Sequence, residues 1–193
     1  MSIQRVEAQL AAKGEVMDGE AVQTFDFSNK VKEILSKHNQ LTPPINVFNI
    51  ALNEGLDLKF LSKRKVKEQH TEGQLAYITR KKMWAIYYNG DANVYRQRFT
   101  VAHELGHYFI HKSSFLDTED TLNRDLQWDY AELQANQFGA ELLMPVEMVL
   151  SEGKKYVDKV ESKYQFVLEM AYVFMVSRIA MQYRLKNLQI LPS

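Results

Sequence analysis

The chain of 193 residues contains no cysteine, which excludes disulfide bonds and thiol catalysis and agrees with a reducing compartment. Its 24 basic and 24 acidic side chains give a formal net charge of zero, so no overall field draws it to nucleic acid or to an anionic membrane. Residues 1–7 lack the apolar core of a signal peptide, and the most apolar stretch, 167–181, is interrupted by Glu169 and Arg178. We therefore expect a cytoplasmic protein without membrane contact.

What the sequence does contain is the motif His103-Glu104-Leu105-Gly106-His107, with two imidazoles four residues apart. Residues i and i+4 project from the same face of an α-helix, so His103 and His107 can reach one tetrahedral metal ion. Glu104 lies beside them and could activate a water molecule there. This spacing is typical of zinc peptidases, although it also occurs on solvated surface helices, and function requires a helix and further ligands.

The helix that the motif requires is predicted over residues 91–111, a stretch without proline. Asp91 or Asn93 can cap its first turn. Gly106 costs about 1 kcal/mol relative to alanine inside a helix, which a close approach of another element would explain. Two mostly apolar rows at helical spacing predict burial of much of the helix, and a buried His-Glu-His cluster favours a bound metal. These rows are Val94, Arg98, Val101, Leu105 and Phe109, and Phe99, Ala102, Gly106 and Ile110.

A third ligand is expected on a second helix, predicted over residues 130–145 and ended by Pro145. Glu132 and Asn136 are again four residues apart and share a face. Glu132 can bind the metal while Asn136 forms a hydrogen bond with a ligating histidine. Glu132 can equally be an exposed helix carboxylate, as most are. Glu141 is the weaker candidate because it lies nine residues further along and points elsewhere.

Residues 98–107 and 132–145 together resemble the ImmA/IrrE family of metallopeptidases. Residues 43–58 and 73–89 resemble the family's segments before the catalytic helix, so that the resemblance covers about residues 25–188. It implies a small thermolysin-related zinc fold. It also implies the roles of four residues, with Glu104 as the catalytic carboxylate and His103, His107 and Glu132 as zinc ligands.

The resemblance also implies a kind of partner. Known members of the family cleave or antagonise cytoplasmic DNA-binding repressors, often in mobile elements, stress responses or toxin–antitoxin pairs. The chain departs from the family at Gln134, where relatives often carry a second acid, and at Gly139, where alanine is usual. Neither departure removes a proposed ligand.

His111 lies four residues after His107, so three histidines follow one another along the predicted helix. On a continuous helix His103 and His111 are about 12 Å apart along the axis, at a rise of about 1.5 Å per residue. One zinc ion with bonds near ~2 Å cannot bind all three. We therefore interpret His111 as a flanking or transition-state-stabilising group, or as a histidine packed at the end of the helix.

The chain length suits one domain, or one domain with a small appendage. We predict an N-terminal helix and connector over residues 1–24, a metallopeptidase domain over 25–155 and a C-terminal helical pair over 156–193. The expected class is α+β, a small and mainly helical zincin-like metallopeptidase fold with a three-stranded antiparallel sheet. Its strands are predicted at 56–61, 74–79 and 83–88, and the last two form a hairpin whose edge could bind an extended peptide. Further elements are predicted as helices over 2–13, 28–38 capped by Ser28, and 46–53, and as loops over 63–67 and 112–127.

The C-terminal stretch 168–185 is predicted to form a helix, a short turn and a second helix capped by Ser177, which resembles a helix-turn-helix. DNA recognition needs basic and polar residues at the start of the second helix, yet the only cations are Arg178, Arg184 and Lys186. We therefore expect the pair to pack on the catalytic core and do not expect direct DNA binding. The apolar residues expected to be buried there are Met175, Ile179 and Leu185.

The sequence thus predicts a zinc metalloendopeptidase with one zinc ion per chain, although another divalent metal stays possible. Zinc would polarise the scissile carbonyl, and Glu104 would carry the proton of the attacking water to the leaving amine. The resemblance implies a helix-turn-helix repressor or antitoxin as the substrate. One competing hypothesis is a metal-binding module that sequesters such a partner without cleaving it. Another is a DNA-binding regulator built around residues 166–188.

Overall fold

The computed structural model describes residues 25–61, 66, 72–112 and 124–191. These residues divide into two compact units, one of residues 46–140 and one of residues 25–45 with 141–191. The helix and connector expected over residues 1–24 lie outside the described residues, as does most of the loop expected over 63–67. The predicted domain boundaries at residues 24 and 155 stay predictions.

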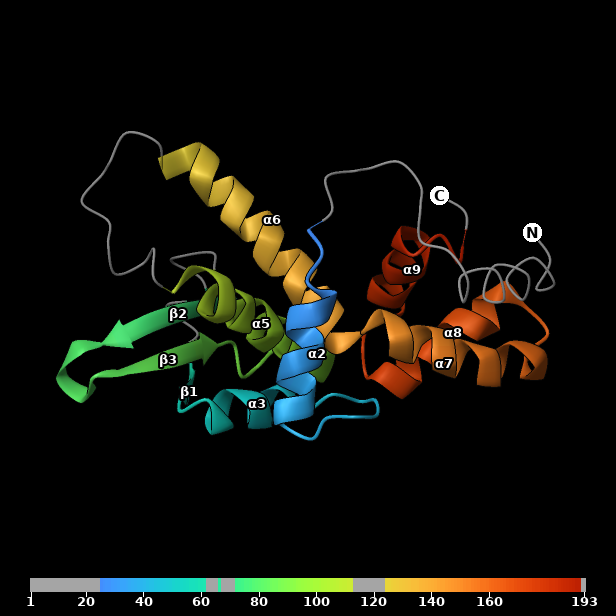
Figure 1. Ribbon diagram of the computed structural model, residues 1–193, viewed down its shortest axis with the longest axis horizontal. Coiled ribbons are helices and arrows are strands. Elements are labelled where there is room, and N and C mark those ends of the chain that lie inside the picture. The colour runs from blue at the N-terminus through green and yellow to red at the C-terminus, as the bar shows by residue number, and fades with distance from the viewer. Residues whose placement is uncertain (1–24, 62–65, 67–71, 113–123, 192–193) are drawn as a thin grey trace. The chain divides into compact units, whose positions relative to one another are not determined.

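The unit of residues 46–140 joins a small sheet to helices (Figure 1). Its last helix begins at Arg124, so the loop predicted over 112–127 is wrong for residues 124–127. Arg124, Leu126 and Gln127 favour a helix intrinsically, a preference that the polar composition of this stretch conceals. In chain order the elements are α3 (Val47–Asn53), β1 (Asp57–Phe60), β2 (Gly73–Ile78), the 3-10 turn η1 (Thr79–Lys81), β3 (Met83–Tyr88), α5 (Val94–Gly106), the π turn η2 (His107–His111) and most of α6 (Arg124–Leu143).

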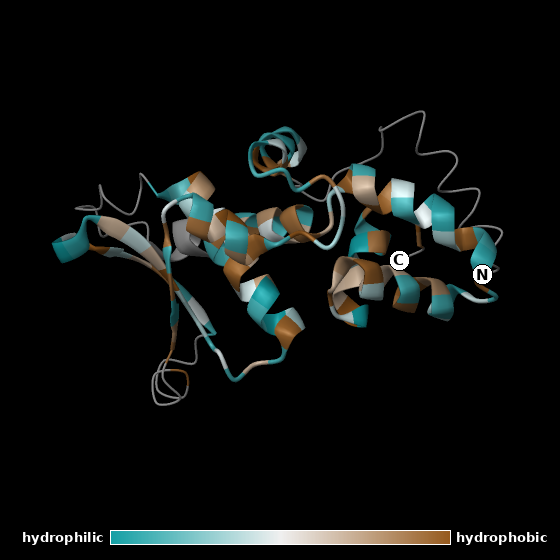
Figure 2. Cartoon of the chain, turned by 90° about the horizontal axis from the view of Figure 1, so that it is seen from below, coloured by the Kyte–Doolittle hydropathy of each residue, from teal (hydrophilic) through white to brown (hydrophobic). Residues whose placement is uncertain are grey.

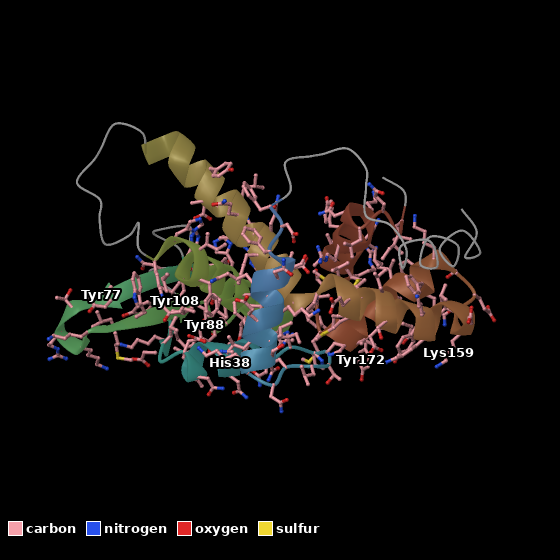
Figure 3. All side chains as sticks on the ribbon, in the orientation of Figure 1. His38, Tyr77, Tyr88, Tyr108, Lys159 and Tyr172 are labelled. Carbon is pink, nitrogen blue, oxygen red and sulfur yellow. The ribbon has the colours of Figure 1, made fainter. Side chains whose placement is uncertain are left out.

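The sheet has the strand order β1-β3-β2 and is mixed. β2 and β3 form the predicted antiparallel hairpin, in which Tyr77 of β2 lies opposite Trp84 with ring centroids 5.3 Å apart (Tyr77 is labelled in Figure 3). β1 pairs with β3 in parallel, so the prediction of a purely antiparallel sheet is wrong for this pair, while the α+β, mainly helical class is confirmed. Alternation of apolar residues reports which face of a strand is buried and carries no information about strand direction.

The core of this unit lies between α5, the sheet and α3, which all contact one another. β3 is the central strand and buries Ala85 and Ile86 completely. On α5, Val101, Ala102 and Leu105 are fully buried, as the apolar rows predicted. The helix that carries the motif is therefore held on several sides, which fixes the direction of its functional side chains.

The unit of residues 25–45 and 141–191 is helical in its described part (Figure 1). The prediction that Ser28 caps the first helix is wrong, because Phe27 occupies the N-cap and makes no side-chain cap bond. The Asp26 carboxylate instead accepts a hydrogen bond from the Ser28 N–H at 2.9 Å, which lowers the pKa of Asp26. The helices are α2 (Ser28–Lys37), the end of α6, α7 (Val146–Tyr156) with the 3-10 turn η3 (Val157–Lys159), α8 (Lys163–Phe174) and α9 (Arg178–Asn187).

The predicted C-terminal helical pair is present as α8 and α9, and the Ser177 hydroxyl caps α9 by accepting from the Ala180 N–H. Leu185 is buried as expected, but the expectation is wrong for Met175 and Ile179, which are 36% and 58% exposed. The buried face of α9 instead carries Met181 and Leu185, four residues apart, and Ile179 projects from another face.

Apolar and polar residues alternate along the helices, as the brown and teal bands of Figure 2 show. No helix among the described residues combines the length and the apolar character needed to cross a membrane.

A buried ion pair holds α9 to the end of α6. The Arg184 guanidinium donates to the Glu141 carboxylate and, from Nε, to the Met144 carbonyl at 2.9 Å. The side chains of Arg184 and Glu141 are only 11% and 12% exposed. Glu141 also accepts a hydrogen bond from the Val146 N–H at the start of α7. Glu141, the weaker candidate for a metal ligand, is thus committed to a structural role.

We expect Arg184→Leu to lower the free energy of unfolding by about 3 kcal/mol, because it leaves the Glu141 charge buried without its partner. The exposed pair Lys32–Glu147, with side chains 65% and 73% exposed, provides the control. Lys32→Ala should cost less than about 1 kcal/mol. Urea unfolding followed by circular dichroism measures both, and equal losses in the two variants would contradict the expectation.

Candidate metal centre

The helix that carries the motif, α5, is capped by Asn93 and not by Asp91. The Asn93 side chain accepts a hydrogen bond from the Arg96 N–H at 3.0 Å. The α-helical part ends at Gly106, and residues 107–111 form one π turn, so the prediction of a continuous α-helix is wrong at its end. A π turn is rare and is found frequently at functional sites.

The structure brings the three predicted ligands together. His103 Nε2 and His107 Nε2 lie 3.1 Å apart, Glu132 Oε2 lies 3.2 Å from His103 Nε2, and Glu132 Oε1 lies 3.0 Å from His107 Nε2. Two imidazole nitrogens that both present lone pairs repel each other at this distance unless a cation or a proton lies between them. Zinc bonds of about 2.0–2.1 Å at tetrahedral angles place ligand atoms roughly 3.3 Å apart, so each of these three distances is close to the ligand spacing of a zinc site.

Small residues set the spacing between the two helices that carry the ligands. A Cβ atom added at Gly106 of α5 would lie 3.0 Å from the backbone Cα and O of Ala135 on α6. One added at Gly139 of α6 would lie 3.1 Å from the backbone N of His103. The energetic cost of a glycine inside the helix suggested a close approach of another element at Gly106. That approach is the crossing of α5 and α6, and the crossing brings Glu132 within reach of both histidines.

We expect Gly106→Val to weaken zinc binding by about tenfold, because the added side chain meets helix backbone and forces α5 and α6 apart. Gly139→Ala, which adds one methyl group, should have a smaller effect. Competition with a chromophoric chelator measures the affinity, and the melting temperature of the zinc-free protein shows whether each variant folds. A folded Gly106→Val protein with unchanged zinc affinity would show that this crossing does not set the ligand spacing.

Glu104, the predicted catalytic carboxylate, is 6% exposed and lies beside strand β2. Its carboxylate accepts a hydrogen bond from the Leu75 backbone N–H, and a Cβ atom at Gly73 would approach its Oε1 to 2.7 Å. Burial is the main cause of a raised pKa of Glu104, and the Glu132 charge adds to it, while His103 and His107 oppose it. A buried carboxyl group with a raised pKa is suited to accept and return a proton.

The charges around the triad favour a positive charge at the imidazoles, either a proton or a metal ion. Hydrogen bonds from His103 and His107 hold the pKa of Glu132 far below its usual range. Burial opposes protonation of His103, but the hydrogen bond to Glu132 and the charges of Glu104 and Glu132 outweigh it and raise the pKa of His103. Glu132 therefore stays ionised and attracts positive charge to the imidazoles, which is the electrostatic setting that a divalent cation needs.

The two remaining candidates lie next to the ligands. Asn136 Oδ1 is 3.0 Å from His103 Nδ1, the geometry predicted for an outer hydrogen-bond partner. His111 Nδ1 is 3.3 Å from His107 Nδ1, and His111 Nε2 is 2.8 Å from Gln134 Oε1. Burial, together with the charges of the other two histidines, lowers the pKa of His111 against the opposing effect of the Gln134 bond. His111 is therefore a flanking group outside the cluster of ligands.

Three residues of this site could not be identified from the sequence: Gly73, Leu75 and Gln134. Leu75 acts through its backbone N–H, which no side-chain pattern reveals. Gly73 directly precedes the predicted strand 74–79 and opens β2 in the structure. A glycine in a strand is a signal of close approach by another element, here by Thr100 and Glu104 of α5. Gln134 stood out in the sequence only because relatives often carry an acidic residue at this position.

Known proteins resemble this chain in sequence and in fold. A profile of peptidases described as the IrrE N-terminal-like domain matches residues 58–186. Metallopeptidase ImmA of Bacillus subtilis (strain 168) is 33% identical over 97 residues, which are 50% of this chain and 53% of that protein. A solved Mycobacterium tuberculosis transcriptional regulator has a TM-score of 0.56 and 14% identity over 96% of this chain and 52% of its own, a likeness of fold alone. The chain thus spans about half the length of each relative.

Proposed function

Because the chain belongs to the ImmA/IrrE family of metallopeptidases, we propose that it is a zinc-dependent endopeptidase that hydrolyses a peptide bond in a cytoplasmic protein. The observation that carries this proposal is the cluster of His103, His107 and Glu132 donor atoms, which approach one another pairwise to 3.0–3.2 Å, next to the buried carboxylate of Glu104. Two imidazoles and one carboxylate, with a further position open, are the ligand set of catalytic zinc sites.

When bound, zinc supplies a Lewis acid that polarises the scissile carbonyl and lowers the pKa of water. The protein supplies the proton transfer. Glu104 takes a proton from the attacking water and delivers it to the leaving amine. Its hydrogen bond from the Leu75 N–H fixes the carboxylate, and its burial keeps bulk water from competing for the proton.

The proposed substrate lies along β2 as an added strand. Among the described strands β2 has a partner on one side only, namely β3. Because the Leu75 N–H points to Glu104, the edge of β2 that faces away from β3 runs past the proposed catalytic carboxylate. An extended peptide that pairs with this edge would bring its backbone to the site with little dependence on side-chain sequence.

We propose a helix-turn-helix repressor or an antitoxin as the substrate, which the family resemblance favours. The test is incubation of the zinc-loaded protein with a helix-turn-helix repressor, taken from the neighbouring gene where that gene encodes one. Mass spectrometry should find two fragments that join at one peptide bond, no fragments after chelation, and restored cleavage after zinc is added back. A repressor that stays intact with the zinc-loaded protein while losing its operator would favour sequestration without cleavage.

Direct recognition of DNA is not part of the proposal. Arg184 is buried in the ion pair with Glu141, and Arg178 lies over the Tyr164 ring and donates to Gln182. We expect binding to duplex DNA no tighter than about 1 µM at physiological salt, because two of the three cations of α9 already have partners within the protein. Fluorescence anisotropy at two salt concentrations measures this. Sub-micromolar, sequence-dependent binding that Arg178→Ala abolishes would make the chain a DNA-binding regulator.

A further inference from the structure

His111 links a predicted ligand to helix α6. Its two ring nitrogens face different partners, since Nδ1 is 3.3 Å from His107 Nδ1 and Nε2 is 2.8 Å from Gln134 Oε1. The three side chains therefore form one hydrogen-bonded row that begins at the ligand and ends on α6. Among the described residues the ligand group consists of His103, His107 and Glu132, and His111 is not part of it, so the row meets the site through His107.

Only one direction of proton donation along this row is compatible with a metal at His107. A ligating Nε2 must present its lone pair, so the proton of the neutral ring is on Nδ1 and is donated to His111 Nδ1. His111 then carries its own proton on Nε2 and donates it to the Gln134 amide oxygen. This oxygen can only accept, so it fixes the direction of both bonds.

We infer that Gln134 is a positioning residue for the metal site, because its amide oxygen orients His111 and His111 in turn holds His107 in the tautomer and ring orientation that bind the metal. The inference rests on the zinc site proposed above and adds a residue that acts on it through another side chain. The outer nitrogen of His103 has a direct counterpart, since Asn136 Oδ1 lies 3.0 Å from it. Both ligating rings are thus tied to α6, one directly and one through His111.

The row is positioned by two local features of the backbone. The π turn of residues 107–111 follows Gly106, and both histidines of the row lie on that turn. Gln134 precedes Ala135, the residue at which α6 contacts Gly106. The crossing of α5 and α6 sets the distance from Glu132 to the two ligating histidines. It therefore also sets the distance from Gln134 to His111, so one helix contact positions a metal ligand and the residue that orients His111.

Zinc affinity of the full chain, measured by chelator competition, tests the inference. Gln134→Met and His111→Phe should each weaken binding by about 10–100-fold, the usual effect of losing an outer partner of a ligating histidine. Gln134→Glu, which can only accept when ionised, should retain affinity. The double variant should bind no more weakly than His111→Phe alone, because Gln134 acts through His111. Gln182→Met on α9, outside the site, is the control for the amide-to-thioether change.

Nitrogen-15 NMR of the zinc-loaded protein gives a second readout, with the proton of His107 expected on Nδ1 and that of His111 on Nε2. Unchanged affinity in Gln134→Met, additive losses in the double variant, an equal loss in Gln134→Glu, or the opposite tautomer of His111 would each overturn the inference while the zinc site stands. A wild-type chain that binds no zinc would overturn the proposed function, and the inference with it.

Discussion

Glu104→Gln is expected to lower kcat/KM for peptide-bond hydrolysis by about 10²–10⁴-fold and to leave zinc bound. The amide is nearly the same size as the carboxylate, and its oxygen can still accept the hydrogen bond from the Leu75 N–H. It cannot take a proton from water, so only the chemical step is lost. The measurement combines the rate of substrate cleavage with elemental analysis of the same purified protein.

The same variant separates cleavage from sequestration in cells. If the chain is a peptidase, wild type should relieve repression by its partner and Glu104→Gln should not, although both bind the partner. Equal relief by the two proteins would favour the metal-binding module that sequesters its partner. Loss of zinc in Glu104→Gln would show instead that this carboxylate supports the metal, and the catalytic assignment would then fail.

The residues of the candidate metal site could be predicted because their chemistry depends on spacing along helices. His103 and His107, and likewise Glu132 and Asn136, are four residues apart, and a helix places each pair on one face. The structure brings all four side chains together at hydrogen-bond or ligand distances. Spacing along each helix could not predict that α5 and α6 meet, because their meeting depends on small residues that face the other helix at the crossing.

Other features depend on tertiary packing, which local patterns do not encode. The direction of β1 relative to β3 follows from the path of the chain between them and not from the residues of either strand. Arg184 looked like one of three cations of a helix-turn-helix, yet it is buried against Glu141. Leu75 reaches Glu104 through its backbone, so any side chain at that position would be equally uninformative.

Removing any one of the three ligands is expected to weaken zinc binding by about 10²–10³-fold. A structural site with four ligands binds zinc with roughly 10–16 kcal/mol, so each ligand contributes on the order of 2.5–4 kcal/mol. His103→Ala, His107→Ala and Glu132→Ala should therefore lose most of their zinc during purification. His38→Ala, at the C-cap of α2, should keep it.

The Glu132 variant is the most informative of the three, because the histidines are defined by their motif and the carboxylate only by its position on α6. Its Oε2 lies 3.2 Å from His103 Nε2 and its Oε1 lies 3.0 Å from His107 Nε2, so all three groups are close enough together to bind one ion. Unchanged zinc in Glu132→Ala would require another donor. Glu141 is committed to Arg184, which leaves His111 as the residue to replace next, and a double Glu132→Ala, His111→Ala variant that still binds zinc would place the site elsewhere in the chain.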